Sequence, residues 1–309
     1  MYLAQIFHER EVKASITRTQ IYVQFKVINM SSKVALVEIS QDIKQSFKHA
    51  LQLIGRIDDL NTANRSVVVK VGVFDHKTDH HTTVNVADAI INSFNKAPQI
   101  FLAESDNYRG KGSERLQIWK TLFTERVTPF NLSEDTNTKQ VKVADEKIGL
   151  SHILFKPNVF VSTHVLRVYE KGSILKNLLG LIPDRKKVRF HKKLTAALLD
   201  MYEAVGGIDL AVLDGTYMSS GVASGSGRIK TNVLLVGKDA VAVEAVGATI
   251  VGLDPGKMPI IQEAVKRGLG EGNVEKIQVL GTPIESLQER FVQLLKTPKK
   301  KRKTLTTKK

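Results

Sequence analysis

Cysteine is absent from the 309-residue sequence. Its absence excludes disulfides, thiolate nucleophiles, and zinc or iron–sulfur sites ligated by cysteine. Aromatic residues make up only 6%, which disfavours the base-stacking surfaces of many nucleic-acid-binding proteins. Long apolar runs are missing too, because the longest, Ala240 to Leu253, contains Glu244 and is too short to cross a bilayer. We therefore expect no membrane span.

An apolar secretion leader is also missing, since charged side chains interrupt the stretch from Met1 to Thr17. We therefore expect a cytoplasmic protein. Hydrophobic residues make up 42% of the chain, which is ordinary for a globular protein and sufficient for a sizeable core.

Acidic residues are scarce relative to basic ones, 31 against 46, and the formal net charge is +15. Eight of the positive charges lie in residues 296–309, which hold no acid and almost no apolar side chain. Such a segment cannot bury itself, so we expect a disordered basic tail. A polyanion or nucleic acid is the partner that this charge fits. A solvated tail without a specific partner is the alternative.

A second basic cluster lies between Pro183 and a predicted helix. Its residues are Arg185, Lys186, Lys187, Arg189, His191, Lys192 and Lys193. Positive charge is unfavourable at the N-terminus of a helix, which favours an anionic ligand or partner there. An exposed loop is the alternative.

Strand patterns and helical patterns follow one another along the chain. Strands are predicted at 20–28, 34–39, 67–73, 99–103, 159–163, 208–213, 231–237 and 276–280, and helices at 40–54, 83–94, 114–123, 174–179, 194–205, 240–251, 259–268 and 284–295. This order predicts an α/β fold with a mixed, mostly parallel sheet and helices on both faces. A polar stretch at 130–147 indicates a join. We therefore expect an N-terminal α/β lobe at 1–147, a C-terminal α/β lobe at 148–295 and the basic tail at 296–309.

A glycine-rich loop is predicted from Gly215 to Gly227, directly after Asp214 and an apolar strand. It lacks the Lys-Ser/Thr end of a P-loop and the helix that follows a dinucleotide-binding fingerprint. Its glycines, Gly215, Gly221, Gly225 and Gly227, still offer backbone N–H groups at the carboxyl end of a strand, where α/β sheets gather ligands. We expect an anion site there, with a flexible surface loop as the alternative.

Three polar side chains interrupt apolar segments. Lys176 and Asn177 lie between leucines, and Glu244 lies in a helix that is apolar almost all round. A lysine in a cleft binds a carboxylate or phosphate, or acts as a base, whereas the alternative is a surface lysine beside a capping Asn. A buried Glu244 needs a cation or several donors, and Lys176 or the 185–193 cluster is its expected partner.

Histidines occur at two kinds of position. His76, His80 and His81 crowd one polar loop and are candidates for a divalent-metal site, with exposed histidines as the alternative. His164 ends a predicted strand and His191 opens a helix. Each of these two is a candidate general acid–base or anion contact.

Several runs resemble the family called domain of unknown function 362. They are Leu175–Pro183 followed by His191, Asp209–Gly215 with its glycine loop, and Lys238–Glu244 followed by Gly252–Pro255. Where the family usually has Lys-Pro-Asn, this chain has Lys70-Val71-Gly72, and where it usually has Asp, Glu244 stands here. Many relatives carry a ferredoxin-like iron–sulfur segment, which a chain without cysteine cannot hold. The sequence does not identify any further cofactor, and a bound metal or flavin stays open.

These observations predict an enzyme that binds an anionic small molecule, a carboxylate or phosphate, in a cleft between lobes. The expected catalytic residues are His164, Lys176 and Asp214, and the expected ligand-binding residues are Asn177, His191, Gly215, Gly221, Gly225, Gly227 and Glu244. A non-enzymatic binding or electron-transfer accessory protein is one alternative. A nucleic-acid-binding protein that uses the tail is the other.

Overall fold

A computed structural model describes residues 31–219 and 227–296, and from Ser32 onward the chain forms one compact unit. Eight strands of this unit form one sheet in the order β10-β1-β9-β8-β7-β2-β3-β4. Their bounds are β1 Lys33–Glu38, β2 Val67–Lys70, β3 Ile100–Glu104, β4 Val127–Asn131, β7 Val159–Arg167, β8 Leu210–Ser219, β9 Arg228–Gly237 and β10 Gln278–Gly281. Strand β9 is antiparallel to both neighbours, and the other paired strands are parallel. The predicted mixed, mostly parallel sheet is confirmed.

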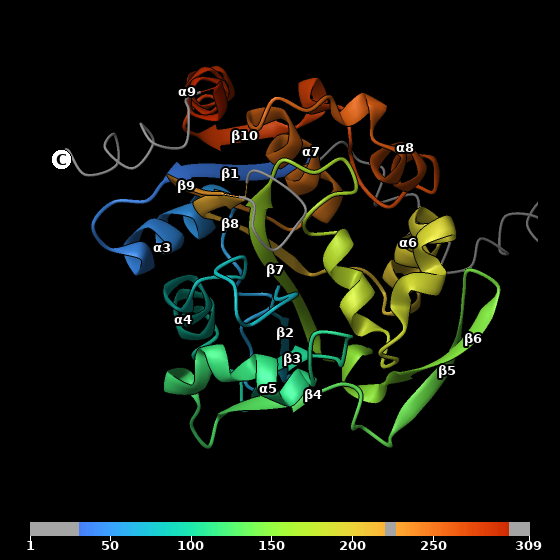
Figure 1. Cartoon of the computed structure of the whole chain (residues 1–309). Helices are drawn as coiled ribbons and strands as arrows, with labels where there is room; N and C mark the ends of the chain where they lie inside the picture. Colours follow the sequence, from blue (N-terminus) through green and yellow to red (C-terminus); the bar gives the residue numbers. More distant parts are fainter. Residues whose placement is uncertain (1–30, 220–226, 297–309) are drawn as a thin grey trace, which may run out of the picture. The chain divides into compact units, whose positions relative to one another are not determined.

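Helices cover both faces of the sheet, as expected (Figure 1). On one face lie α3 (Ile43–Leu53), α4 (Val84–Ser93), α5 (Gly112–Leu116) and the 3₁₀ helix η1 (Gln117–Leu122). On the other lie α6 (Leu194–Ala204), α7 (Ala240–Ile250), α8 (Pro259–Lys266) and α9 (Ile284–Lys296). Short 3₁₀ helices connect these elements at η2 (His152–Leu154), η3 (Lys176–Leu181), η4 (Lys187–Lys193), η5 (Pro255–Lys257) and η6 (Val274–Lys276).

Side-chain alternation along the strands explains the two cores. In β2, Val67 and Val69 pack toward α3 and α4, whereas Val68 packs toward the opposite core. Strands that are buried on both faces read as near-continuous apolar runs, as β2 does. Polar side chains that interrupt such runs are exceptions and are therefore candidates for a functional site.

The polar stretch at 130–147 contains a hairpin that the sequence analysis did not predict. Strands β5 (Thr138–Val143) and β6 (Glu146–Ser151) pair antiparallel, and the turn between them places Ala144 and Asp145 at positive φ. The hairpin does not divide the sheet, because β1 to β4 precede it and β7 to β10 follow it in the same eight-stranded sheet. The two expected lobes therefore share one sheet.

The predicted loop from Gly215 to Gly227 begins later than expected. Residues Gly215 to Ser219 belong to strand β8, with an irregularity in its pairing to β9 between Gly215 and Tyr217. A Cβ atom at Gly215 would lie 2.4 Å from Cγ2 of Val233, so this glycine is required by close packing within the sheet. Gly227 directly precedes β9, while Gly221 and Gly225 lie outside the described residues.

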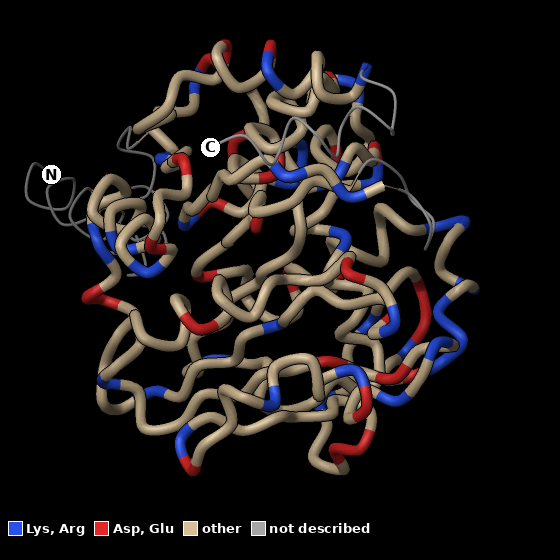
Figure 2. The backbone as a smooth tube through the Cα atoms, turned by 60° about the vertical axis from the view of Figure 1, so that its left-hand side comes forward, with Lys and Arg blue, Asp and Glu red and all other residues tan. Residues whose placement is uncertain are grey.

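Two further predictions also fall outside the described residues. They are the strand at 20–28 and the basic tail, of which only Lys296 is described. In the part that is described, positively and negatively charged positions are interspersed along the backbone (Figure 2). No helix within this part is both long and apolar enough to cross a membrane.

Candidate functional site

Polar side chains gather where β2, β3 and β7 end. Lys70, at the end of β2, is completely buried. Its ammonium group donates to Oε2 of Glu104, to Oδ1 of Asn177 and to the carbonyl of Val71, each at 3.0 Å. All three donor positions of this lysine are therefore used within the protein.

Glu104 is surrounded by an excess of positive charge. Burial alone raises the pKa of its carboxyl, but the charges of Lys70, Arg115 and Lys187 outweigh burial and lower it. Arg115 lies 3.5 Å from Glu104 and donates to the carbonyls of Val73 and Ser105. This buried charge network joins β2 and β3 to α5.

Lys187, from the 185–193 cluster, is the third cation of this network. Its ammonium group donates to Oγ of Ser105 and to the carbonyl of Asp106, both at 2.6 Å. Burial lowers its pKa to about 7. The negative charge of Glu104 opposes this shift, whereas the positive charges of Lys70 and Arg115 add to it. The residue is 9% exposed. This part of the cluster is therefore not the exposed loop that was the alternative.

Asn177 connects the end of β2 to the middle of β7. Its Nδ2 group donates to the carbonyls of Lys70 (3.0 Å) and Thr163 (3.1 Å) and lies 3.2 Å from Oγ of Ser162. Because its oxygen also accepts from Lys70, the amide is fully engaged. The predicted helix at 174–179 is the 3₁₀ helix η3, and Asn177 is buried in it.

His164 lies on β7 beside a second group of cations. Its Nδ1 accepts from the backbone N–H of Val165 at 2.7 Å, and its Nε2 lies 2.6 Å from Nη2 of Arg167. A Cβ atom at Gly72 would lie 2.5 Å from Cγ of the ring. Burial lowers the pKa of His164 well below its ordinary value, as do the charges of Arg167, Lys70 and Lys176, so the ring is neutral near pH 7.

Lys176 differs from the buried lysines Lys70 and Lys187 because no side chain in the described part of the chain neutralises it. Within residues 31–219 and 227–296, its Nζ makes no hydrogen bond or ion pair. Burial, together with the charges of Arg167 and Lys171, lowers its pKa to about 8. The residue is partly exposed.

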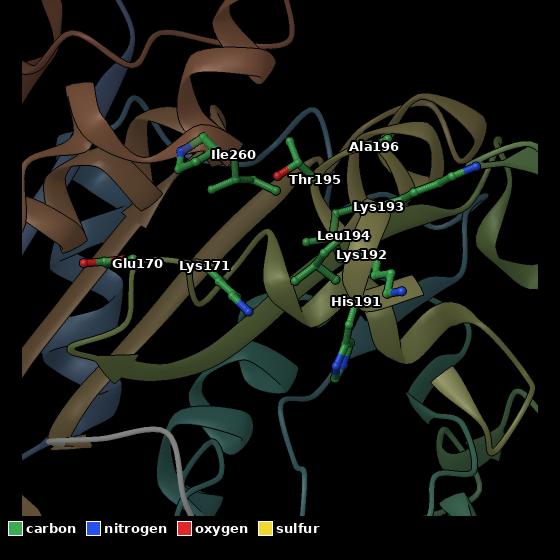
Figure 3. A pocket seen from close by; sticks show the side chains of 11 residues that line it. Glu170, Lys171, His191, Lys192, Lys193, Leu194, Thr195, Ala196 and Ile260 are labelled. Atoms are coloured by element: carbon green, nitrogen blue, oxygen red, sulfur yellow. The ribbon is translucent and has the colours of Figure 1, made fainter. Parts of the chain in front are cut away.

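Further basic side chains lie between Lys176 and the surface. His191 has a lowered pKa, first because of partial burial and then because of the charges of Lys176 and Lys171. Lys171 and His191 line opposite sides of a hollow of about 250 Å³, which Figure 3 shows with Glu170 beside Lys171 and Lys192 beside His191. The N-terminal residues of α6, Leu194 and Thr195, complete one wall.

Glu244 holds the loop that carries Lys176 and Asn177. Its Oε1 accepts from the N–H of Ser173 at 2.8 Å, and its Oε2 accepts from the N–H of Leu175 at 2.9 Å. Burial raises the pKa of its carboxyl, while these backbone bonds and the charge of Arg167 oppose the rise. The expected ion pair with Lys176 or with the 185–193 cluster is wrong: within the described residues Glu244 forms no ion pair, and backbone N–H groups meet both of its oxygens.

Asp214 is also engaged with the protein itself. One carboxyl oxygen accepts from the N–H (2.7 Å) and the hydroxyl (2.8 Å) of Thr83, the N-cap residue of α4, and the other accepts from the N–H of Thr216 at 2.9 Å. Asp214 thereby fastens α4 to β8. These contacts are those of a structural anchor, and none of them involves the cations around Lys176.

The polar histidine loop does not form a metal cluster. Nδ1 of His81 lies 2.9 Å from the carbonyl of Thr82, and its ring meets that of Trp119 edge-on. Nδ1 of His76 is buried without a hydrogen-bond partner among the described residues. No group of three His, Asp or Glu side chains in residues 31–219 and 227–296 is arranged to hold a metal ion, so His76, His80 and His81 lack that arrangement.

The expected site residues thus separate into two sets. One region holds His164, Lys176, Asn177 and His191. Glu244 belongs to the same region because it holds the loop that carries Lys176. Asp214 instead fastens β8 to α4, and Gly215 lies in the interior of the sheet. Sequence reasoning missed Glu104, Arg115 and Arg167. Glu104 and Arg167 each end an apolar strand, which is the signal that singled out His164 and Asp214.

Comparison with known proteins assigns the chain to a family. The family model described as "Domain of unknown function (DUF362)" matches residues 67–249, more than half of the chain, and the chain therefore belongs to this family. No curated protein matches. Among solved structures, the lactate racemase apoprotein from Thermoanaerobacterium thermosaccharolyticum is similar, with 10% identity and a TM-score of 0.44. The match covers 66% of this chain and 53% of that one, so this chain spans about half its length.

Proposed function

We propose that this protein is an enzyme that binds an anionic small molecule, a carboxylate or phosphate, at the carboxyl end of β7. The observation that carries the proposal is the unneutralised charge of Lys176 beside Arg167 and Lys171. Keeping several cations together in a partly buried region costs free energy. A bound anion would supply the missing counter-charge, and the low dielectric of the site would strengthen its binding.

The carboxylates in residues 31–219 and 227–296 do not meet this need. Glu244 is the acid that interacts with Arg167, but its oxygens accept from the backbone of Ser173 and Leu175. Glu104 is engaged by Lys70 and by the N–H of Ser105, on the other side of Asn177. An external anion is therefore the simplest partner for the group formed by Arg167, Lys171, Lys176 and His191.

Each residue has a distinct role in this proposal. Arg167 and Lys171 hold the anion, and Lys176 gains or loses a proton near neutral pH, as a general acid–base must. His164 is a positioning residue, because its neutral ring contacts Arg167. Glu244 is a second positioning residue, because it fixes the loop that carries Lys176.

Titration calorimetry with inorganic phosphate and with acetate tests the proposal. We expect Lys176→Met and Arg167→Gln each to weaken binding of the better anion by about tenfold or more, as loss of one charge-assisted contact does. Lys48→Met, which removes an exposed lysine on α3, is the matched control and should bind like the wild type. If both site variants bind as tightly as the control, the anion site lies elsewhere.

A cytoplasmic location is part of the same proposal. Fractionation of cells that express the full chain tests it, and recovery mainly with membranes would contradict it.

A further inference from the structure

Two aromatic rings lie exposed side by side on loops that follow the carboxyl ends of β2 and β3. Phe74, in the loop after β2, is 39% exposed, and Tyr108, in the turn after β3, is 68% exposed. Their ring centroids are 5.3 Å apart and their planes meet at 71°, an edge-to-face pair. In residues 31–219 and 227–296, only two other large apolar side chains, Val188 and Val265, are exposed. We call Phe74 and Tyr108 the aromatic platform.

Hydrogen bonds fix the two loops that carry the platform. The buried side chain of Asn107 donates from Nδ2 to the carbonyl of Phe74 at 2.9 Å, and its Oδ1 accepts from the N–H of Arg109 at 2.7 Å. The backbone of Asn107 also exchanges two hydrogen bonds with that of Gly110, at 3.1 and 3.2 Å. A surface that is ordered before its partner arrives loses little conformational entropy on binding.

Positively charged side chains lie directly beside the rings. The guanidinium carbon of Arg109 is 5.1 Å from the ring centroid of Tyr108 and 6.0 Å from that of Phe74. Nε of Arg185 donates at 3.4 Å to the carbonyl that precedes Tyr108 in the chain. Arg185 and its neighbour Lys186 are exposed, and neither forms an ion pair within the described residues. The platform therefore has cations at its edge that are available to a partner.

Acidic side chains close to these cations are engaged within the protein. Asp75 is buried, and its Oδ2 lies 3.8 Å from Nε of Arg109. Oδ1 of Asp106 accepts from two N–H groups, at 2.8 and 3.0 Å. Asp184 forms an ion pair with Arg189. The charge that the platform presents to solvent is therefore mainly positive.

Exposed rings next to cations match the chemistry of a single-stranded nucleic acid. Every unpaired base has a π-face that stacks on an aromatic ring, and every phosphate carries a negative charge. We propose that Tyr108 stacks on a base of a single-stranded nucleic acid while Arg109 and Arg185 contact its phosphates. The net charge of +15 favours the same partner. A low aromatic content disfavours an extended stacking surface, but one base needs only one exposed ring. This inference does not depend on the anion site around Lys176.

Fluorescence anisotropy of the full chain with two labelled strands tests the proposal. One strand is oligothymidine of about ten nucleotides, within the usual range of single-strand site sizes. The other is an abasic strand of the same length, which keeps the phosphates and lacks the bases, so it reports charge alone. We expect the wild type to bind oligothymidine about tenfold more tightly than the abasic strand.

Variants at the platform separate stacking from charge. Tyr108→Ala should weaken oligothymidine binding by about tenfold and leave abasic binding unchanged, with the thermal midpoint of the wild type because the side chain is mostly exposed. Tyr108→Phe keeps the ring and should bind both strands like the wild type. Val265→Ala, which shortens an exposed apolar side chain on α8, is the matched control and should also bind like the wild type.

The salt dependence of binding tests the role of the cations. Arg109→Gln should weaken binding of both strands and reduce the slope of log affinity against log salt by about 0.7, the value for one phosphate contact on a single strand. Three results would each overturn the proposal: no binding of either strand, equal binding of the two strands by the wild type, or a Tyr108→Ala variant that binds oligothymidine as tightly as the Val265→Ala control.

Discussion

At the scale of single residues, the charge of Lys176 lowers the stability of the folded state. Its ammonium group is held near Arg167 and Lys171, and its pKa is lowered to about 8 by burial and by those charges. A lysine in the unfolded chain titrates near 10.5. The folded state therefore holds this charge at a cost of up to about 3 kcal/mol, since each pKa unit corresponds to about 1.4 kcal/mol.

The cost predicts how stability depends on pH. Between about pH 8 and pH 10.5 the unfolded chain binds more protons at this residue than the folded chain does. The free energy of unfolding then rises with pH through this window, and the penalty is present in full below it. We expect Lys176→Met to be more stable than the wild type at pH 7, and the difference to shrink toward pH 10.5.

Chemical denaturation of both proteins at several pH values measures this difference. Because only the difference between the two proteins is used, titration of other groups cancels to first order. A Lys176→Met variant that is less stable than the wild type at pH 7 would show that the lysine is structural.

At the scale of elements, the loop between β7 and η3 is held by a carboxylate of α7. Glu244 accepts from Ser173 and Leu175, and a Cβ atom at Gly172 would lie 3.0 Å from its Oε2. Gly172 also has a φ of +85°, which favours glycine. The loop closes tightly over the carboxylate for these reasons, and the position of Lys176 follows from that closure.

Substitution of Glu244 by Gln tests this arrangement. One carboxylate oxygen becomes an amide NH₂ group that faces a backbone N–H, so we expect a loss of about 1–3 kcal/mol in the free energy of unfolding. We also expect weaker phosphate binding, because Lys176 and Asn177 lose their support. Glu275→Gln, at an exposed position, is the control for both measurements. Unchanged phosphate binding in a destabilised Glu244→Gln variant would separate the loop from the site.

The helices and strands also show which parts of the fold the sequence patterns could predict. The periodicity predicted most strands and helices, because each buries a continuous apolar face. It missed the β5–β6 hairpin, in which β5 is mostly exposed, and it took Gly215 for loop rather than close-packed strand. It located Lys176 and Glu244 as polar residues in apolar runs. It could not predict that backbone N–H groups, rather than Lys176, would meet Glu244, because that depends on how a loop closes in space.

At the scale of the whole described unit, one sheet unites the two halves of the chain. β2 and β3 from the first half continue into β7 and β8 from the second, and β1 lies between β9 and β10. Halves that complete each other's sheet leave unpaired strand edges when separated. We therefore expect the full chain to unfold as one cooperative unit rather than as two lobes.

Thermal unfolding followed by two probes tests this prediction. The one tryptophan, Trp119, is completely buried and reports on the first half, whereas far-ultraviolet circular dichroism reports on all helices and strands. Coincident transitions are expected for a single unit. A tryptophan transition separated from the circular dichroism transition would support two independently stable lobes.

The most direct test of the anion site is the pKa of Lys176 itself, with and without phosphate. Competitive labelling of the full chain with acetic anhydride over a range of pH, read on the Lys176 peptide, gives this value. We predict a pKa of about 8 without phosphate and a clear rise when phosphate is saturating, because a bound anion favours the charged amine. An ordinary lysine pKa that phosphate does not change would contradict the account.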